Sequence, residues 1–345
     1  MIFERSLSAQ TAYAQLFEAC QAAEALRSVS NLPDSFATKT VRGRKYWYFQ
    51  YTEPVGKLRQ VYVGPDSPLV QDLIAKKVVP ASREAIGRLA KSATVLGCEE
   101  VRPKHYRVIE RLADYGFFRA GGVLIGTHAL IAYGNLMGVR WDNPERAQEK
   151  GFAHIGQNLS IALPNTLSLG TDGTVQSLSL GLLPIAGLSD KNGTTYLNPS
   201  DSEFKLNFIT AMQGEAVATN QLPGITLQPL RFTEYLLGSV QEAVIFYGGK
   251  AVIVNIPAPA HYALHKLLIY GEYQGPFQPD IEQGLQQAAS LLSLLKERFP
   301  WEIEDAWLGL AAHGSDWERC AKQGLVQLGQ RYPGVFASEM PLTPN

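Results

Sequence analysis

Cysteine is scarce in this sequence, and the spacing of the three that occur argues against both a disulfide framework and a structural zinc site. Cys20, Cys98 and Cys320 lie far apart and form no CxxC or CxxH pair. A disulfide framework uses an even set of cysteines, and a structural zinc site uses closely spaced pairs of ligands. We therefore expect these thiols to be reduced, either buried or without a chemical role, in a protein of the cytoplasm.

Long apolar runs are also missing. No stretch reaches the roughly 18 apolar residues that a membrane-spanning helix needs. The first residues, MIFERSLSAQ, carry a glutamate at position 4 and lack the apolar core of a secretion signal. The sequence thus predicts a cytoplasmic chain without a membrane partner.

The sequence also lacks an excess of charge of either sign. The 31 Lys and Arg residues balance the 32 Asp and Glu residues, for a net charge of −1. This excludes a chain that coats nucleic acid by its overall charge, although a local basic face remains open. With 345 residues, 46% of them hydrophobic, the chain is long and apolar enough for more than one packed unit.

The first third of the sequence predicts three segments. Residues 1–35 contain a helix, because apolar residues recur at helical spacing up to Leu26. Residues 36–66 alternate, with turn signals that divide them into a three-stranded meander. Its aromatic residues are interleaved with Lys and Arg, which is typical either of a nucleic-acid surface or, as we favour here, of solvated edge charges over a small aromatic core. Residues 67–118 form a helical linker region.

The remainder predicts a mixed core followed by helices. Residues 119–258 combine a strand–turn–helix unit, alternating strands near 159–163 and 204–209, and a hairpin around Gly248-Gly249. We expect a polar, exposed loop from Asp190 to Ser202. Residues 259–345 have helical periodicity. The predicted fold class is α+β: a mixed β-sheet core with helices, preceded by a small meander and followed by a helical region.

Gly126 and Thr127 stand at the strongest local signal, a turn between an apolar strand and a helix. A glycine there lets backbone N–H groups face an anion, and the helix dipole adds to the attraction. Thr127 is expected to act as the N-cap or as a phosphate donor. His128 follows, either as a nucleotide contact or as a residue that satisfies a local backbone group.

Four stretches, in this order and spacing, resemble the nucleotidyltransferase superfamily, and more narrowly a bacterial family of nucleotidyltransferase-like proteins. They are GVLIGTHALIAYGNLMGVRW at 122–141, FAHIGQNLSIALP at 152–164, FKLNFITAMQG at 204–214 and VNIPAPAHYALHKLL at 254–268. The resemblance implies a nucleotidyltransferase core and metal-dependent transfer of a nucleotide. In that chemistry the glycine turn holds the triphosphate. Two carboxylates at i and i+2 on the next strand, with a third on a neighbouring strand, bind two Mg²⁺ ions.

Carried onto this sequence, the resemblance places the three carboxylate positions at Glu149, Gly151 and Asn207. Glu149 keeps an acid and is the one predicted metal ligand, Gly151 has no side chain, and Asn207 has an uncharged amide. Lys150 adds a positive charge beside the expected ions. We therefore expect nucleotidyl transfer to be lost or strongly reduced, and the protein to act by binding a nucleotide, an RNA or a protein partner.

The predicted nucleotide-binding residues are Gly126, Thr127, His128 and, by resemblance, Lys266 on a later helix. His261 and His265 have the i, i+4 spacing of a zinc site, but the glutamate that accompanies such a pair is missing.

The alternative is an active Mg²⁺-dependent nucleotidyltransferase that uses Glu149 together with Asp142 or Glu145. Pro144 makes a strand at those positions less favourable.

Overall fold

The structure is a computed structural model. It describes residues 2–25, 35–41, 43–52, 58–77, 80–114, 117–119, 121–141, 158–163, 183–185, 195–198, 201–212, 221–222, 225–226, 228–273, 275 and 278–335. Within these ranges, no helix combines the length and the apolar composition needed to cross a bilayer.

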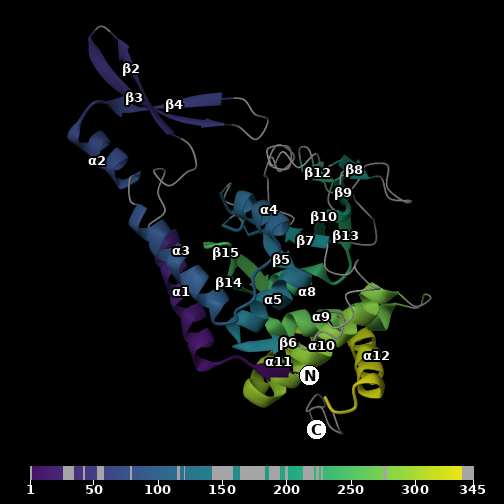
Figure 1. The fold of residues 1–345 in the computed structure, drawn as a ribbon. Coiled ribbons are helices and arrows are strands. Elements are labelled where there is room, and N and C mark those ends of the chain that lie inside the picture. Colours follow the sequence, from purple (N-terminus) through teal and green to yellow (C-terminus); the bar gives the residue numbers. More distant parts are fainter. Residues whose placement is uncertain are drawn as a thin grey trace.

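A mixed β-sheet forms the centre of the described molecule (Figure 1). Its strand order is β14-β15-β5-β7-β10-β9-β8, and β13 pairs with β10 off this path. The pairs β15–β5, β7–β10 and β10–β13 are parallel, and the remaining neighbours are antiparallel. The strands are β5 (Val123–Ile125), β7 (Asn158–Leu163), β8 (Leu183–Ile185), β9 (Thr195–Asn198), β10 (Asp201–Ala211), β13 (Gln228–Leu230), β14 (Val240–Tyr247) and β15 (Lys250–Pro257). A separate pair, β11 (Gln221–Leu222) and β12 (Ile225–Thr226), lies off this sheet.

The local sequence explains two parts of this sheet. All three residues of β5 are buried, because its Val-Leu-Ile run lies in the middle of the sheet with covered faces. The β14–β15 hairpin turns at Gly248 and Gly249, whose φ angles of 59° and 78° are those of a tight type I′ turn. The hairpin prediction is confirmed.

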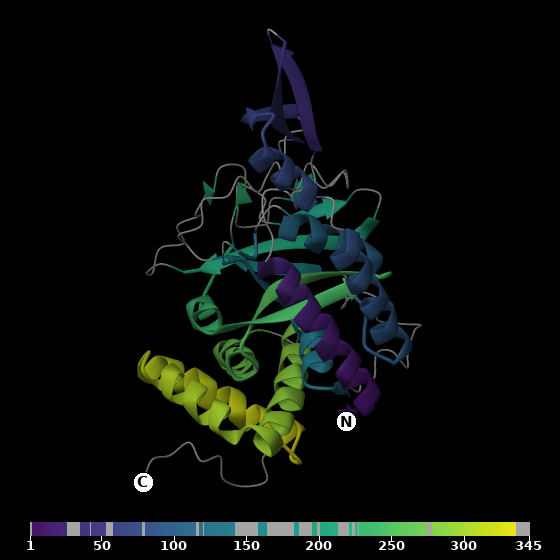
Figure 2. The same cartoon turned by 90° about the vertical axis from the view of Figure 1, so that its left-hand side faces the viewer.

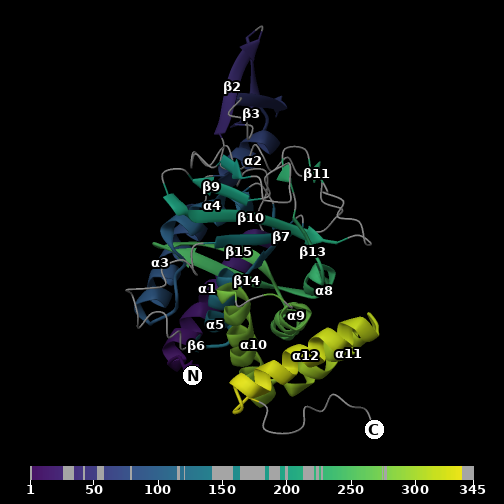
Figure 3. The ribbon, with the colours of Figure 1, turned by 90° about the vertical axis from the view of Figure 1, so that its right-hand side faces the viewer.

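Two hydrophobic cores pack on the sheet. The smaller one lies between β14–β15 and the helices α1 (Leu7–Ala25) and α3 (Pro80–Val95), and contains Leu16 and Phe246. Figures 2 and 3 show α1 and α3 side by side along the sheet, with the C-terminal helices at another end. The larger core joins the sheet to the helices from α4 onward. These are α4 (Pro103–Asp114), α5 (Thr127–Leu136), α8 (Thr233–Gly238), α9 (Pro259–Glu272), α10 (Pro279–Arg298), α11 (Pro300–Ala311) and α12 (Ser315–Arg331).

Helices α9 and α12 approach each other closely at two glycines. A Cβ added at Gly271 would lie well inside 3.0 Å of the Cys320 carbonyl oxygen, and one added at Gly324 would meet the Leu267 carbonyl in the same way. Because backbone atoms cannot swing aside as side chains do, only glycine fits at these two positions.

The predicted meander is present and stands apart from the body of the molecule. It consists of β2 (Ser35–Val41), β3 (Arg44–Thr52) and β4 (Leu58–Pro65), paired antiparallel in sequence order. Helix α2 (Pro68–Lys77) follows it and leads back to α3 (Figure 1). In all three ribbon views the meander projects from the end of the molecule opposite the C-terminal helices.

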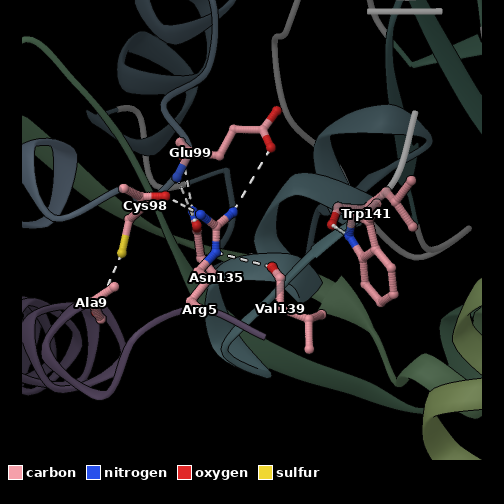
Figure 4. Close-up of polar contacts among 9 residues, drawn as sticks. Arg5, Ala9, Cys98, Glu99, Asn135, Val139 and Trp141 are labelled. Carbon is pink, nitrogen blue, oxygen red and sulfur yellow. Dashed lines mark hydrogen bonds and ion pairs between the residues drawn. The ribbon is translucent and has the colours of Figure 1, made fainter. Parts of the chain in front are cut away.

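A polar network fixes the far end of α5, as Figure 4 shows. Strand β1 (Ile2–Glu4) pairs with β6 (Val139–Trp141), and the following Arg5 donates from Nε to the Val139 carbonyl at 3.0 Å. Its guanidinium also lies 3.9 Å from a Glu99 carboxylate oxygen. Asn135 exchanges two hydrogen bonds of 2.8 Å with the Glu99 backbone. The N-terminus, the α3–α4 connection and α5 are thereby held as one unit.

The α+β prediction is confirmed, and two local predictions need correction. Helix α5 begins at Thr127 with Gly126 in the N-cap position, so Thr127 is not the N-cap. The predicted loop at 190–202 contains β9, because its polar residues pair through their backbone with β10. The predicted division into five segments stays a prediction.

Candidate functional site

The turn between β5 and α5 has a geometry that requires glycine. Gly126 has φ 71° and ψ −147°, a region that residues with a Cβ rarely adopt. The first N–H groups of α5 follow immediately and have no partner within the helix. The turn therefore offers backbone donors and a helix dipole to an anion, as the sequence predicted.

Two strands bring uncharged polar residues to this turn. Strand β7 runs antiparallel to β5 and places Ser160 opposite Ile125. A Cβ added at Gly126 would lie 4.0 Å from the Ser160 Cβ. Strand β10 runs parallel to β7 and places Asn207 opposite Ser160. We call Gly126, Thr127, Ser160 and Asn207 the turn cluster.

Asn207 is the unusual member of the turn cluster. The residue is half-buried, yet its side-chain Oδ1 is buried and has no hydrogen-bond partner. A buried acceptor without a donor costs about 1–3 kcal/mol unless something else supplies the hydrogen bond. The Asn207 amide is thus an available acceptor two strands from the glycine turn.

Strand β7, which lies next to the turn, contains no Asp or Glu. Magnesium takes hard oxygen ligands, chiefly carboxylates, at short distances. Ser160 and Asn207 bring no negative charge, so on their own they do not fit two such ions.

The residues predicted to keep or replace the carboxylates lie elsewhere in the sequence. Glu149 and Gly151, like Asp142 and Glu145, fall between β6 and β7, outside the described residues. Their assignment stays a prediction.

His128 points into the protein. It is 2% exposed, and its Nε2 lies 2.7 Å from Nδ1 of His105 on α4. Burial lowers the pKa of His128 to about 3, and the charges of His105 and Arg102 act in the same direction. A neutral ring packed on α4 is not positioned to meet a phosphate in this conformation. Its role as a nucleotide contact stays a prediction.

Lys266 is half-buried between α9 and α10. Its Nζ lies 5.1 Å from the centre of the Tyr262 ring, and its stem lies near Gly284. Burial lowers the pKa of Lys266 to about 8, while the Asp280 carboxylate opposes that shift. The amine therefore still carries its proton at neutral pH and loses it more easily than an exposed lysine does. Its predicted phosphate contact stays a prediction.

The two histidines of α9 face different neighbours. His261 stacks on Tyr235 with ring centres 4.7 Å apart. His265 is 8% exposed, neither of its ring nitrogens has a hydrogen-bond partner, and burial lowers its pKa to about 3. Among the residues that the structure describes, no three His, Cys, Asp or Glu side chains gather as a metal site would require.

Sequence reasoning missed a groove at the other end of the fold. It has a volume of about 840 Å³ and lies where the end of α9 meets α12. Its lining includes Tyr270, Tyr273, Arg319 and Lys322. No sequence signal could have found it, because it exists only through the packing of two helices that are far apart in the chain.

A mixed sheet with a glycine turn leading into a buried helix, and a strand pair beside that turn, is consistent with an α+β fold of the nucleotidyltransferase type. The chain matches the family described as Nucleotidyltransferase over residues 104–312, more than half of its length, and it belongs to that family. The match runs from α4 to the end of α11 and leaves out the meander. No curated protein and no solved structure matches the chain. The superfamily predicted from the sequence is confirmed.

Proposed function

We propose that this protein keeps the nucleotidyltransferase fold while metal-dependent transfer is lost or strongly reduced, and that it acts by binding a nucleotide, an RNA or a protein partner. The observation that carries the proposal is the uncharged pair Ser160 and Asn207 beside the Gly126 turn. These are the two polar side chains that the neighbouring strands β7 and β10 present beside the turn, and neither is charged.

The electrostatic argument is simple. Two Mg²⁺ ions bring four positive charges, and they bind where several carboxylates offset that charge. A hydroxyl and an amide bring none. Removal of a single group that stabilises a transition state already costs about 10²–10³ in rate. Loss of the ions themselves removes more, since they clamp both the attacking and the leaving oxygen.

Binding does not need the metal ions. The Gly126 turn and the N-terminus of α5 supply backbone donors for a phosphate or another anion. The unpartnered Asn207 Oδ1 supplies an acceptor for a ligand hydroxyl or amine. Donors on one side and an acceptor on the other suit the phosphate and the sugar or base of a nucleotide.

A transfer assay tests the lost activity. The chain is incubated with α-phosphate-labelled NTPs and Mg²⁺ or Mn²⁺, beside Glu149→Ala and two variants that restore acids, Gly151→Asp with Asn207→Asp and Ser160→Asp with Asn207→Asp. We expect the native chain to be inert or nearly so. Robust turnover by the native chain that Glu149→Ala abolishes would instead establish the active enzyme, with Asp142 or Glu145 as the partner acid.

A binding assay tests the retained site. Binding of a fluorescent NTP is measured with EDTA present, for the native chain and for Asn207→Ala and Thr127→Ala. We expect metal-independent binding that Asn207→Ala weakens by about tenfold, the loss of a single hydrogen bond to a buried acceptor. Binding that requires one or two equivalents of Mg²⁺ contradicts the proposal.

A further inference from the structure

The β2–β3–β4 meander has two different faces, and only one of them is covered. Side chains of β3 alternate, so that Tyr46 and Tyr48 point to one side and Trp47 to the other. The Trp47 side faces α2: Trp47 Nε1 donates to Asp66 Oδ1 at 2.8 Å, and Gly64 lies against Val70. Trp47 and Val70 thus connect this side of the meander to α2.

The other face carries a cluster of tyrosines that no helix of the described chain packs against. Tyr48 lies directly across from Tyr62, with ring centres 5.6 Å apart, and Tyr46 is 6.2 Å from Tyr62. Tyr62 is 54% exposed. The three tyrosine rings therefore lie together on this face, with Tyr46 and Tyr48 half-buried and Tyr62 exposed.

Positive charge accompanies the tyrosines. Lys39 pairs across from Tyr46, and its Nζ lies 4.8 Å from the centre of the Tyr48 ring. Arg44 is exposed and, by alternation, is on the same face. We call Tyr46, Tyr48, Tyr62, Lys39 and Arg44 the tyrosine face.

The charge of the segment is one-sided. Residues 35–65 hold six Lys or Arg residues and one acid, Glu53, in a chain whose overall net charge is −1. None of the three strands contains Asp or Glu. A surface that combines neighbouring tyrosine rings, in edge-on and tilted contact, with an excess of cations is complementary to a polyanion that carries flat apolar rings.

We infer that the tyrosine face binds a single-stranded polynucleotide. Unpaired bases stack on the tyrosine rings, and Lys39 and Arg44 contact the adjacent phosphates. A duplex fits less well, because its base faces are already stacked on one another. The inference deepens the proposed function by naming the class of its partner, but it uses residues outside the matched range of 104–312.

Fluorescence anisotropy with the full-length chain tests this inference. The probes are an unstructured RNA of about 12 nucleotides, a DNA of the same sequence and its duplex, a length within the usual range for such surfaces. We expect the single strands to bind more tightly than the duplex. The RNA and DNA arms show whether the sugar 2′-hydroxyl contributes.

Matched variants separate the tyrosine face from general charge. Tyr62→Leu and Tyr48→Leu should each weaken binding about tenfold, whereas Tyr62→Phe, which keeps the ring, should bind like the native chain. Lys39→Gln with Arg44→Gln should lower the slope of log K against log salt by about 1.4, since each phosphate contact on a single strand contributes roughly 0.7. Lys45→Gln, which removes one charge from the covered face, is the control and should leave affinity nearly unchanged.

Three results would overturn the inference: no binding at about 50 mM salt, where such contacts are strong; equal losses for Lys45→Gln and for the tyrosine-face variants; or tighter binding of the duplex. Thermal melts of each variant show that it is folded, and Trp301→Leu, an exposed aromatic residue on α11, controls for non-specific effects. Binding of the fluorescent NTP, measured in parallel, reports on the turn cluster alone. A loss in one assay without the other therefore shows which of the two proposals has failed.

Discussion

Replacement of Gly271 by alanine is expected to separate α9 from α12. The added Cβ would meet three backbone atoms inside 3.0 Å: the carbonyl oxygen and carbon of Cys320 and the amide nitrogen of Gly324. None of these can move without the helix that carries it. The two helices must therefore shift apart, and the interface also includes Leu267, which is fully buried.

The magnitude follows from two opposing effects. Forcing a methyl group into a packed core costs about 1–3 kcal/mol, and the upper end applies here because backbone atoms are displaced. Alanine improves helix propensity by about 1 kcal/mol at most. We expect a net loss of about 2 kcal/mol in the free energy of unfolding, which lowers the melting temperature by about 3 °C for a chain of 345 residues.

Urea denaturation followed by circular dichroism measures this loss. Gly329→Ala on α12 is the matched control, because nothing lies within 4 Å of a Cβ added there. The control should be neutral or slightly stabilising. If Gly271→Ala were as stable as Gly329→Ala, the close approach of α9 and α12 would be wrong.

Three further predictions concern stability. The folded-state pKa of about 3 for His128 and His265 lies below their ordinary 6.5, so the unfolded state binds more protons between these values. The contribution of these histidines to the free energy of unfolding should therefore be fully present above pH 6.5. It should fall as the pH drops toward 3, by about 1.4 kcal/mol per pH unit for each histidine. His265→Leu should flatten this dependence in urea titrations at pH 7, 6 and 5, and an unchanged slope would contradict the burial of a neutral ring. Asn135→Ala removes both hydrogen bonds to the Glu99 backbone and should cost about 2 kcal/mol, against almost nothing for the exposed Gln330→Ala on α12. Tyr13→Phe removes the hydroxyl that hydrogen-bonds both the carbonyl and the amide of Val244 at 3.0 Å. We expect it to cost about 1–2 kcal/mol in the same assay. A variant as stable as the native chain would show that water replaces the hydroxyl.

Much of the fold could be predicted because the signals are local. Two glycines between alternating apolar residues predict the β14–β15 hairpin, and apolar spacing predicts α9 to α12. The prediction that Thr127 is the N-cap was wrong, because Gly126 takes that position. The positive φ of Gly126 cannot be read from the sequence. The strand β9 was missed because it is only four residues long in a polar, turn-rich stretch, and it forms through backbone pairing with β10 and β8.

The candidate site was predicted only in part, for a related reason. Gly126 and Thr127 are neighbours in sequence and carry their own signal. Ser160 and Asn207 become their neighbours through strand pairing, which joins residues tens of positions apart and depends on register. The inward direction of His128 likewise depends on α4, which packs over α5.

The sequence by itself determined the element order, the α+β class, the glycine turn and the superfamily, because periodicity, turn residues and motif order are properties of neighbouring positions. Only the tertiary structure decided that neutral side chains face the turn, that the tyrosines of the meander lie on its open side, and that α9 and α12 touch at glycines. Each of these depends on which side of an element faces another element, and that is settled when the separate segments pack together.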